Sequence, residues 1–445
     1  MRKLLIPLLC LMMTIPVASE VAPLYTKAQA LLTHMQAGEE EAALLMMADT
    51  MRTAMAGQVK AVWENLTASF GAFKEAGAWQ ASIADGYDII ELTLVFDRAK
   101  LIQRTVFDGE GQVAGLFYTP GEVVAQAAPP AGFTEQPIQV DAGTGFPLEG
   151  LLSLPESGEV LAGLVLVQGS GPSDRNEKLY ANTPFQDLAW GLAKRGIAVV
   201  RYDKRTFVYG QQIAKSPEYI TLTVDQETAL DAAAAVQLLK NRAELQGKKV
   251  FILGHSLGGM LTAYINTLGA GADGYINLAG SPRKLWEISA DQNDLLAAEV
   301  DVKTAQAIRQ QVAGEVEKAK RLPDMSDQAA KDPANLVMGL PAWYQRHLAG
   351  IDTAGLHLAD GLPVLILHGG RDRQVSLRDY DAWQERLAGH PDAQFILYPD
   401  LNHLFGHFEG ETLPLSQISL EYGQRTPIPD EVMDDIAGWM LKRAW

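Results

Sequence analysis

The 445-residue chain contains a single cysteine, Cys10, and it lies near the N-terminus. No cysteine follows it in the rest of the chain. A folded chain without cysteine cannot form a disulfide bond, use a thiol as a nucleophile or build a cysteine-based metal site. The sequence therefore excludes these three kinds of chemistry from its folded part.

Basic residues are also scarce. The chain has 37 Lys and Arg against 54 Asp and Glu, which gives a formal net charge of −17 at pH 7. The basic residues are not gathered into runs. Nucleic acids and anionic membrane surfaces both attract positively charged patches. We therefore expect neither of them as the main partner.

The apolar run at the N-terminus, Leu4–Val17, is too short to cross a membrane, which takes about 20 residues. The basic residues Arg2 and Lys3 precede it, and small residues follow it. This pattern predicts a secretory signal, Met1–Ser19, cleaved near Glu20. The protein is then exported to the periplasm or medium, without stable membrane insertion. An uncleaved anchor is the alternative.

The length of the chain favours two domains, at about 150 residues each. From residue 20 to about 75 the apolar residues recur at helical spacing. Three strands are then predicted, at Tyr87–Phe96, Leu101–Phe107 and Val113–Tyr118. Helices followed by a small antiparallel sheet predict an α+β domain over residues 20–120, in which no polar cluster looks catalytic. The proline- and alanine-rich residues 121–135 are predicted to be a linker.

From residue 136 to 445 strands alternate with helices. The expected strands are 138–140, 148–154, 161–167, 197–202, 250–253, 275–278, 363–367 and 395–398. The first two form a hairpin, and the rest predict a doubly wound, mostly parallel sheet. In such a sheet a ligand binds beyond the carboxyl ends of the strands.

Residues 285–357 interrupt this alternation with a long amphipathic helix around Val302–Val316 and an aromatic stretch that includes Trp343 and Tyr344. We expect a helical cap that covers the site. The alternative is a peripheral helical bundle without substrate contact.

The stretch Gly254-His255-Ser256-Leu257-Gly258 lies between an apolar strand and a helical pattern. This is the context of a Gly-x-Ser-x-Gly nucleophile elbow, in which a sharp turn exposes the serine hydroxyl. The two glycines are needed because side chains there would make strand and helix collide. A glycine-rich turn with an incidental serine is the alternative.

A serine nucleophile needs a base, and the base needs an orienting acid. Asp372 follows the strand 363–367, and His403 follows the strand 395–398. The order Ser256, Asp372, His403 is that of a catalytic triad in α/β-hydrolases. His407 is an alternative base and Asp203 an alternative acid, although Asp203 is expected to pair with a nearby cation. His255 and His368 are expected to serve packing and structure.

An oxyanion hole needs backbone N–H donors. One is expected from Leu257, directly after the nucleophile. The second is expected from Ser170, with Gly169 as the next choice, in the loop after the strand 161–167. This loop lacks the Gly-Lys-Ser/Thr ending of a phosphate-binding loop.

Several stretches resemble bacterial α/β-hydrolase carboxylesterases, in the branch that is similar to dienelactone hydrolases and acyl transferases. They are Gly169–Asn176, Arg201–Arg205, Gly254–Gly259, the Asp372 loop and Leu401–His403. The resemblance covers residues 135–445. It implies an α/β-hydrolase fold and cofactor-free hydrolysis of small esters, commonly with short acyl chains. Thr206 stands where the family often has glycine, so substrate specificity does not carry over.

The sequence thus predicts a serine carboxylesterase that works through an acyl-enzyme, with the cap around Trp343 and Tyr344 shaping the acyl pocket. Thioesters and peptides are alternative substrates for the same residues. An exported binding protein that keeps the hydrolase fold without turnover is a second hypothesis. No metal or other cofactor is expected, and the sequence gives no indication of the oligomeric state.

Overall fold

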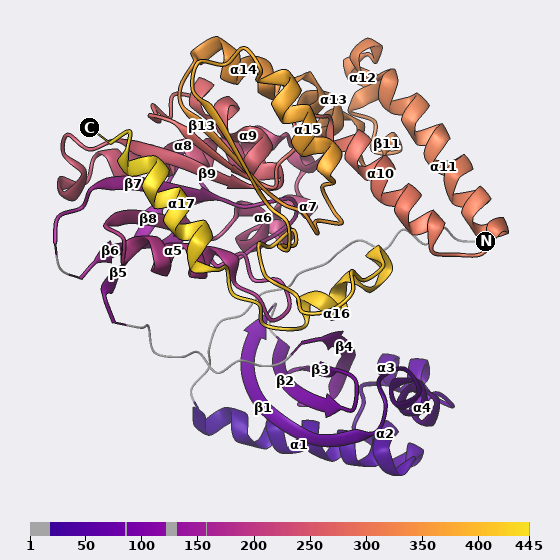
Figure 1. Ribbon diagram of the computed structural model, residues 1–445. Coiled ribbons are helices and arrows are strands. Elements are labelled where there is room, and N and C mark those ends of the chain that lie inside the picture. The colour runs from indigo at the N-terminus through magenta and orange to yellow at the C-terminus, as the bar shows by residue number, and fades with distance from the viewer. Residues whose placement is uncertain (1–17, 85–86, 122–130, 157, 445) are drawn as a thin grey trace.

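The structure, a computed structural model, describes residues 18–84, 87–121, 131–156 and 158–444. A small α+β domain precedes a large α/β domain (Figure 1). The predicted signal segment, apart from its last two residues, lies outside the described residues. So do residues 122–130 of the predicted linker. No helix in the described part of the chain is long and apolar enough to cross a membrane.

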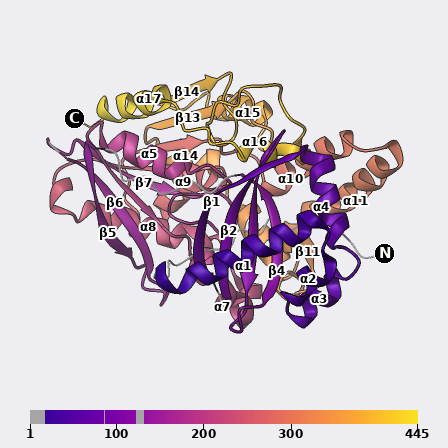
Figure 2. The ribbon, with the colours of Figure 1, turned by 90° about the horizontal axis from the view of Figure 1, so that it is seen from below.

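The small domain packs helices on one face of a four-stranded antiparallel sheet with the order β1-β2-β3-β4. The elements are α1 (Ala18–Ala37), α2 (Glu40–Leu45), α3 (Asp49–Met55), α4 (Val59–Phe70), β1 (Phe73–Ala84), β2 (Tyr87–Phe96), β3 (Lys100–Phe107) and β4 (Val113–Pro120). Helix α1 runs across the strands, as Figure 2 shows. Its buried residues Ala28, Leu31 and Met35 share a core with Ile90 and Phe107 of the sheet.

Strand β1 is absent from the sequence prediction, which carried the helical region to about residue 75 and expected only three strands. Its sequence, FKEAGAWQASIA, is rich in alanine and contains Lys74, Glu75 and Gly77, which are residue types that strands usually avoid. Pairing with β2 from Phe73 to Ala84, interrupted by irregular register near Gly77, holds it in the sheet. The helical expectation for Phe73–Glu75 was therefore wrong, because pairing with a neighbouring strand overrides local preference.

The large domain has an eight-stranded sheet with the order β14-β13-β10-β9-β7-β8-β6-β5. The strands are β5 (Phe133–Val140), β6 (Leu148–Pro155), β7 (Ala162–Val167), β8 (Ile197–Tyr202), β9 (Val250–His255), β10 (Tyr275–Leu278), β13 (Val364–Gly369) and β14 (Ala393–Tyr398). The antiparallel pairings in this sheet join β6 to β5 and to β8, and the other pairings between neighbouring strands are parallel. This agrees with the predicted hairpin and mostly parallel sheet. Strand β5 begins at Phe133, three residues before the boundary predicted at 136.

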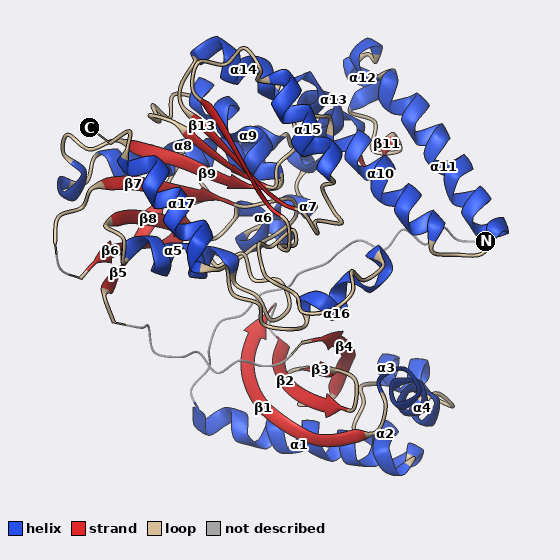
Figure 3. Cartoon of the chain, in the orientation of Figure 1, coloured by secondary structure: helices blue, strands red, loops and turns tan. Residues whose placement is uncertain are grey.

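Helices cover both faces of this sheet (Figure 3). They are α5 (Pro184–Ala193) and α17 (Asp430–Leu441) on one face, and α8 (Leu230–Lys240), α9 (Leu257–Thr267) and α15 (Leu377–Arg386) on the other. Strand β7 shows the reason for its unbroken apolar sequence. Leu164 and Leu166 pack on the α5 side, and Val165 and Val167 on the α8 side. A strand buried on both faces has to be apolar throughout.

Apart from the insertion between β10 and β13, the remaining elements of the large domain are short helices in its loops. They are α6 (Arg205–Val208), α7 (Gly210–Lys215), α16 (Ile418–Tyr422), the 3-10 turns η1 (Pro217–Thr221), η3 (Ala243–Leu245) and η5 (Leu415–Gln417), and one π-helical turn, η2 (Asp225–Ala229). Helix α16 lies between the large domain and the end of β4 (Figure 1). A side chain at Gly423 would come within 3.0 Å of Pro120, so the two domains touch closely here.

The predicted insertion is helical and lies between β10 and β13. It consists of α10 (Leu285–Ala298), α11 (Val302–Lys320), η4 (Leu322–Asp324), α12 (Asp327–Ala330), the short strands β11 (Leu336–Val337) and β12 (Leu340–Pro341), α13 (Ala342–Gly350) and α14 (Thr353–Asp360). Tyr344 and Leu348 of α13 belong to the main core, whereas Ala319 of α11 packs in a separate small cluster. Helix α13 therefore anchors the insertion to the sheet domain.

Candidate active site

Ser256 occupies a strained turn between β9 and α9. Its backbone angles are φ 52° and ψ −116°, in a region that residues other than glycine rarely adopt. The Ser256 N–H donates to the Leu278 carbonyl at 2.9 Å, and the Ser256 carbonyl accepts from Met260 N–H at 3.1 Å. The surrounding backbone thus holds the turn that an exposed nucleophile requires.

The glycines on either side of Ser256 are required by close backbone contacts. A Cβ on Gly254 would lie 2.1 Å from the Gly258 carbonyl oxygen, and a Cβ on Gly258 would lie 2.2 Å from that of Val167. Real Cβ atoms do not approach backbone this closely. The steric reason inferred from the sequence, a collision of strand and helix, is therefore confirmed.

Asp372 and His403 form a direct buried pair. The Nδ1 atom of His403 lies 2.6 Å from Oδ2 of Asp372. The other carboxylate oxygen of Asp372 accepts the N–H groups of Gln374 and Val375 at 2.8 and 2.9 Å, which fixes its orientation. Burial favours the neutral acid, but the attraction of His403 outweighs it and lowers the pKa of Asp372. The carboxylate is therefore ionised and orients the imidazole.

Ser256 lies beside this pair at the same edge of the sheet. The ring centroids of His255 and His403 are 4.7 Å apart, and Nε2 of His255 lies 2.9 Å from the His403 carbonyl oxygen. Within the described residues, no hydrogen bond joins the Ser256 hydroxyl to His403. Such bonds are often long before substrate binds. The structure thus joins two of the three predicted residues and places the third on the adjacent turn.

The loop after β7 lies against the nucleophile. A Cβ on Gly169 would lie 3.2 Å from Cβ of Ser256. The Gly169 N–H donates to Oε1 of Glu177 at 2.7 Å, so it is already engaged. The Ser170 N–H has no acceptor among the described residues. Leu257 is the first residue of α9, and such N–H groups lack an intrahelical acceptor. Of the two donors weighed in this loop, Ser170 is therefore the available one.

The alternative acid and base have other environments. Asp203 accepts from the Arg175 guanidinium and from the Arg175 N–H at 2.8 Å, so it is paired as expected. The side chain of His407 is exposed and lines a surface hollow with Arg425 and Asp430. Nε2 of His368 contacts the Val375 carbonyl at 3.1 Å, and burial lowers its pKa. None of these residues contacts the Asp372–His403 pair through a hydrogen bond.

Asn402 is a supporting residue that the sequence reasoning did not assign. Its Oδ1 accepts the N–H groups of Leu404 and Gly406, both at 3.0 Å, and so folds the chain around His403. Its Nδ2 donates to Glu421 of α16 at 2.6 Å. The available signal in the sequence was an asparagine directly before the predicted base, since Asn side chains commonly bind the backbone two residues on in an Asx turn.

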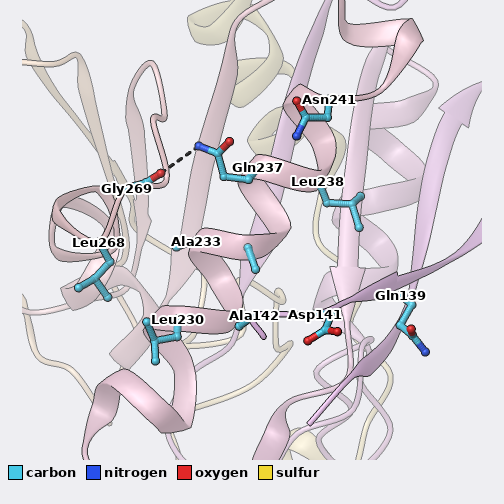
Figure 4. Close-up of a pocket in the computed structure, with 11 residues that line it drawn as sticks. Gln139, Asp141, Ala142, Leu230, Ala233, Gln237, Leu238, Asn241, Leu268 and Gly269 are labelled. Atoms are coloured by element: carbon cyan, nitrogen blue, oxygen red, sulfur yellow. Dashed lines mark hydrogen bonds between the residues drawn. The ribbon is translucent and has the colours of Figure 1, made fainter. Parts of the chain in front are cut away.

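A second hollow runs along α8 and has a volume of about 500 Å³ (Figure 4). Gln139 and Asp141 approach it from the edge of the sheet, and Gln237 donates to the Gly269 carbonyl beside it. Its lining contains none of the predicted catalytic residues. In the described part of the chain, no group of three or more His, Cys, Asp or Glu side chains could hold a metal ion.

Comparison with known proteins places the chain in a family. Residues 182–410 match the family described as serine aminopeptidase, S33, and residues 28–116 match a family described as a protein of unknown function, DUF3887. The chain is 33% identical over 414 residues to Esterase EstD of Thermotoga maritima, covering 92% of this chain and 93% of EstD.

Solved structures that are similar to this chain include the Pyrococcus furiosus esterase Pf2001. Its TM-score is 0.44 and its identity 14%, and the match covers 74% of this chain and 98% of that one. Est1E of Butyrivibrio proteoclasticus has a TM-score of 0.42 and 15% identity, covering 69% and 98%. The near full-length match to EstD and the parallel sheet with its elbow lead to one conclusion. The chain belongs to the α/β-hydrolase family, and within it to the esterases related to EstD.

Proposed function

We propose that the protein is a serine hydrolase that cleaves small carboxylic esters through an acyl-enzyme intermediate. The observation that carries the proposal is the buried Asp372–His403 pair beside the strained turn of Ser256. The name of its relative, Esterase EstD, supports the ester as substrate class.

In the first half-reaction the Ser256 hydroxyl oxygen attacks the carbonyl carbon of the ester, and Nε2 of His403 takes the hydroxyl proton. Asp372 keeps the other ring nitrogen protonated and stabilises the imidazolium that forms. The N–H groups of Leu257 and Ser170 bind the negative oxygen of the tetrahedral intermediate. His403 then gives the proton to the leaving alcohol, and the acyl group stays on Ser256.

In the second half-reaction water takes the place of the alcohol. His403 removes its proton, the hydroxide attacks the acyl carbon, and the acid leaves as Ser256 recovers its proton. We expect short acyl chains to be preferred. Thioesters and aminoacyl peptides are alternative substrates for the same groups, and the name of the matched serine aminopeptidase family makes peptides the second candidate.

Two measurements test the proposal. A fluorophosphonate probe should label Ser256, and Ser256→Ala should abolish the labelling. Hydrolysis rates with p-nitrophenyl esters of increasing acyl length should be highest for the short chains, and they should exceed the rates with aminoacyl p-nitroanilides. Faster cleavage of the anilides would favour the peptidase alternative. A folded protein that neither reacts with the probe nor hydrolyses any ester would support the binding-protein hypothesis.

A further inference from the structure

Lys204 is a buried lysine whose ammonium group contacts the loop beside Ser256. Its side chain is 1% exposed, and Nζ donates to the Gly169 carbonyl at 2.8 Å. A buried charge is costly unless it is paired and hydrogen-bonded. Oε1 of Glu227 supplies the pairing at 2.7 Å. The lysine thus holds one defined backbone oxygen from inside the protein.

That oxygen belongs to the peptide bond between Gly169 and Ser170. A trans peptide is planar, so its carbonyl oxygen and its N–H point in opposite directions. An ammonium group at the Gly169 oxygen therefore fixes the direction of the Ser170 N–H. It also polarises the peptide, because hydrogen bonds in a low-dielectric interior strengthen one another. The Ser170 N–H is the proposed donor to the oxyanion.

Gly169 is a glycine and could adopt backbone conformations that other residues avoid, so its contacts decide how its peptide groups are oriented. Its N–H is held on the opposite side by Glu177, whose second oxygen lies 3.0 Å from Nδ1 of His255. With Lys204 on the carbonyl and Glu177 on the N–H, both polar groups of Gly169 bind buried side chains. The loop is thereby kept from rotating its peptide away from Ser256.

The cap reaches the same lysine. The Tyr344 hydroxyl of α13 donates to Oε2 of Glu227, the carboxylate that pairs with Lys204. Glu227 lies in η2, and single π-helical turns inside helices often occur at functional sites. Tyr344, Glu227 and Lys204 are each less than one-tenth exposed. A continuous set of hydrogen bonds therefore runs from the insertion to the loop of Gly169 and Ser170 after β7, called the oxyanion loop below.

We infer that Lys204 is a positioning residue that orients the Ser170 N–H toward the oxyanion, and that Tyr344 of the cap acts on it through Glu227. The inference rests on the proposed serine-esterase function. It assigns Lys204 a role in stabilising the transition state. The Ser170 N–H binds most strongly when the carbonyl oxygen of the substrate becomes negative.

A neighbouring ion pair provides a matched control. Arg205 and Asp231 are as buried as Lys204 and pair at 2.6 Å, one residue further along the chain. Arg205 donates to both oxygens of Asp231 and to neither Gly169 nor Ser170. Removing Arg205 therefore removes a buried charge from the same segment without touching the oxyanion loop.

The test compares Lys204→Met, Lys204→Arg, Tyr344→Phe and Arg205→Met with a short p-nitrophenyl ester, counting active sites with a fluorophosphonate probe. Lys204→Met should lower kcat by about 10- to 100-fold with little change in KM, because outright loss of an oxyanion donor costs about 10²–10³. Affinity for an arylboronic acid, whose serine adduct is tetrahedral, should fall in parallel. Lys204→Arg should have a higher kcat and boronate affinity than Lys204→Met. Tyr344→Phe should lower kcat and boronate affinity by a smaller factor than Lys204→Met.

Arg205→Met should lower the unfolding temperature and retain kcat per labelled site. The inference is overturned if Lys204→Met keeps kcat and boronate affinity, or if Arg205→Met loses them equally. If Lys204→Met does not fold, Lys204→Arg and Tyr344→Phe decide, and unchanged values in both reject the inference. Ser256→Ala distinguishes failure of this inference from failure of the proposed function. Full esterase activity in Ser256→Ala would contradict the proposed function itself.

Discussion

His403 and Asp372 meet because two neighbouring parallel strands end beside each other. Strands β13 and β14 pair in parallel as far as Gly369 and Tyr398, and the loops that follow place Nδ1 of His403 2.6 Å from Oδ2 of Asp372. Both side chains are buried, so solvent does not weaken their interaction.

We predict that Ser256→Ala and His403→Ala each remove nearly all ester hydrolysis, since a hydroxyl without a base stays protonated and weakly nucleophilic. Asp372→Asn keeps the shape but favours the wrong tautomer of His403, and we expect a loss of about 10⁴-fold in kcat by analogy with serine proteases. Steady-state kinetics on each variant checks this.

His407→Ala serves as the control, because the side chain of His407 is exposed and makes no hydrogen bond to Asp372. It should keep most of the activity. Double substitutions within the three residues should be hardly worse than single ones, since the residues act as a unit. An inactive His407→Ala beside an active His403→Ala would reassign the base.

Glu421→Leu should lower kcat by about tenfold with a small change in KM. The substitution removes the acceptor of Asn402, the residue that folds the loop around His403. A buried amide left without a partner costs about 1–3 kcal/mol. Kinetics per labelled serine separates this effect from a lower folded fraction. Glu411 is an exposed residue in the loop before η5, and Glu411→Leu should behave like wild type. Equal kcat in Glu421→Leu and Glu411→Leu would show that α16 does not support the site.

Trp343→Ala should leave the acyl-length profile unchanged and lower the unfolding temperature, contrary to the expectation from the sequence. The indole lies 4.2 Å from Nζ of Lys331 and 4.7 Å from the Arg346 guanidinium, both within the insertion. Tyr344, by contrast, donates a hydrogen bond to Glu227 of the sheet domain. A shifted preference among p-nitrophenyl esters would return Trp343 to the acyl pocket.

His357 predicts a loss of stability in mild acid. Burial lowers its pKa from 6.5 to about 3, and its ring packs between Tyr275 and Trp383. Below pH 6.5 His357 binds a proton in the unfolded chain but remains neutral in the folded chain until the pH approaches 3. Stability is therefore complete above pH 6.5 and falls progressively toward pH 3. Between pH 7 and 5 this site should cost about 2 kcal/mol of unfolding free energy.

Urea unfolding of His357→Phe at the two pH values measures this contribution. Phenylalanine fits the aromatic surroundings and has no proton to bind, so the difference in unfolding free energy should shrink by about 2 kcal/mol. His407→Gln, which changes an exposed histidine, should keep the wild-type difference. The same pH dependence in His357→Phe and wild type would rule out His357 as the source.

We propose that the protein is exported and that its mature form begins near Glu20. The basic n-region, the short apolar run and the small residues up to Ser19 motivate this. N-terminal sequencing of the protein from the periplasm or the medium should start within a few residues of Glu20. A product that retains Met1 would favour the uncleaved anchor.

The sequence by itself determined the parallel sheet, the elbow and the residues that follow its strands. These features are local: a strand buried on both faces is written as a continuous apolar run, and the turn at Ser256 requires glycine at 254 and 258. The ends of parallel strands lie at one edge of a sheet, so residues after Val364–Gly369 and Ala393–Tyr398 could be expected to meet.

Only the tertiary structure decided β1 and the support of the oxyanion loop. Strand β1 has weak strand propensity and is held by its partner β2, which no local pattern reveals. Tyr344 and Glu227 are 117 positions apart, and Lys204 and Gly169 are 35 apart. A lone Lys or Glu in a sequence most often faces solvent, and a lone Tyr gives no clear indication of burial. Burial together with a defined partner turns Lys204, Glu227 and Tyr344 into a connected set.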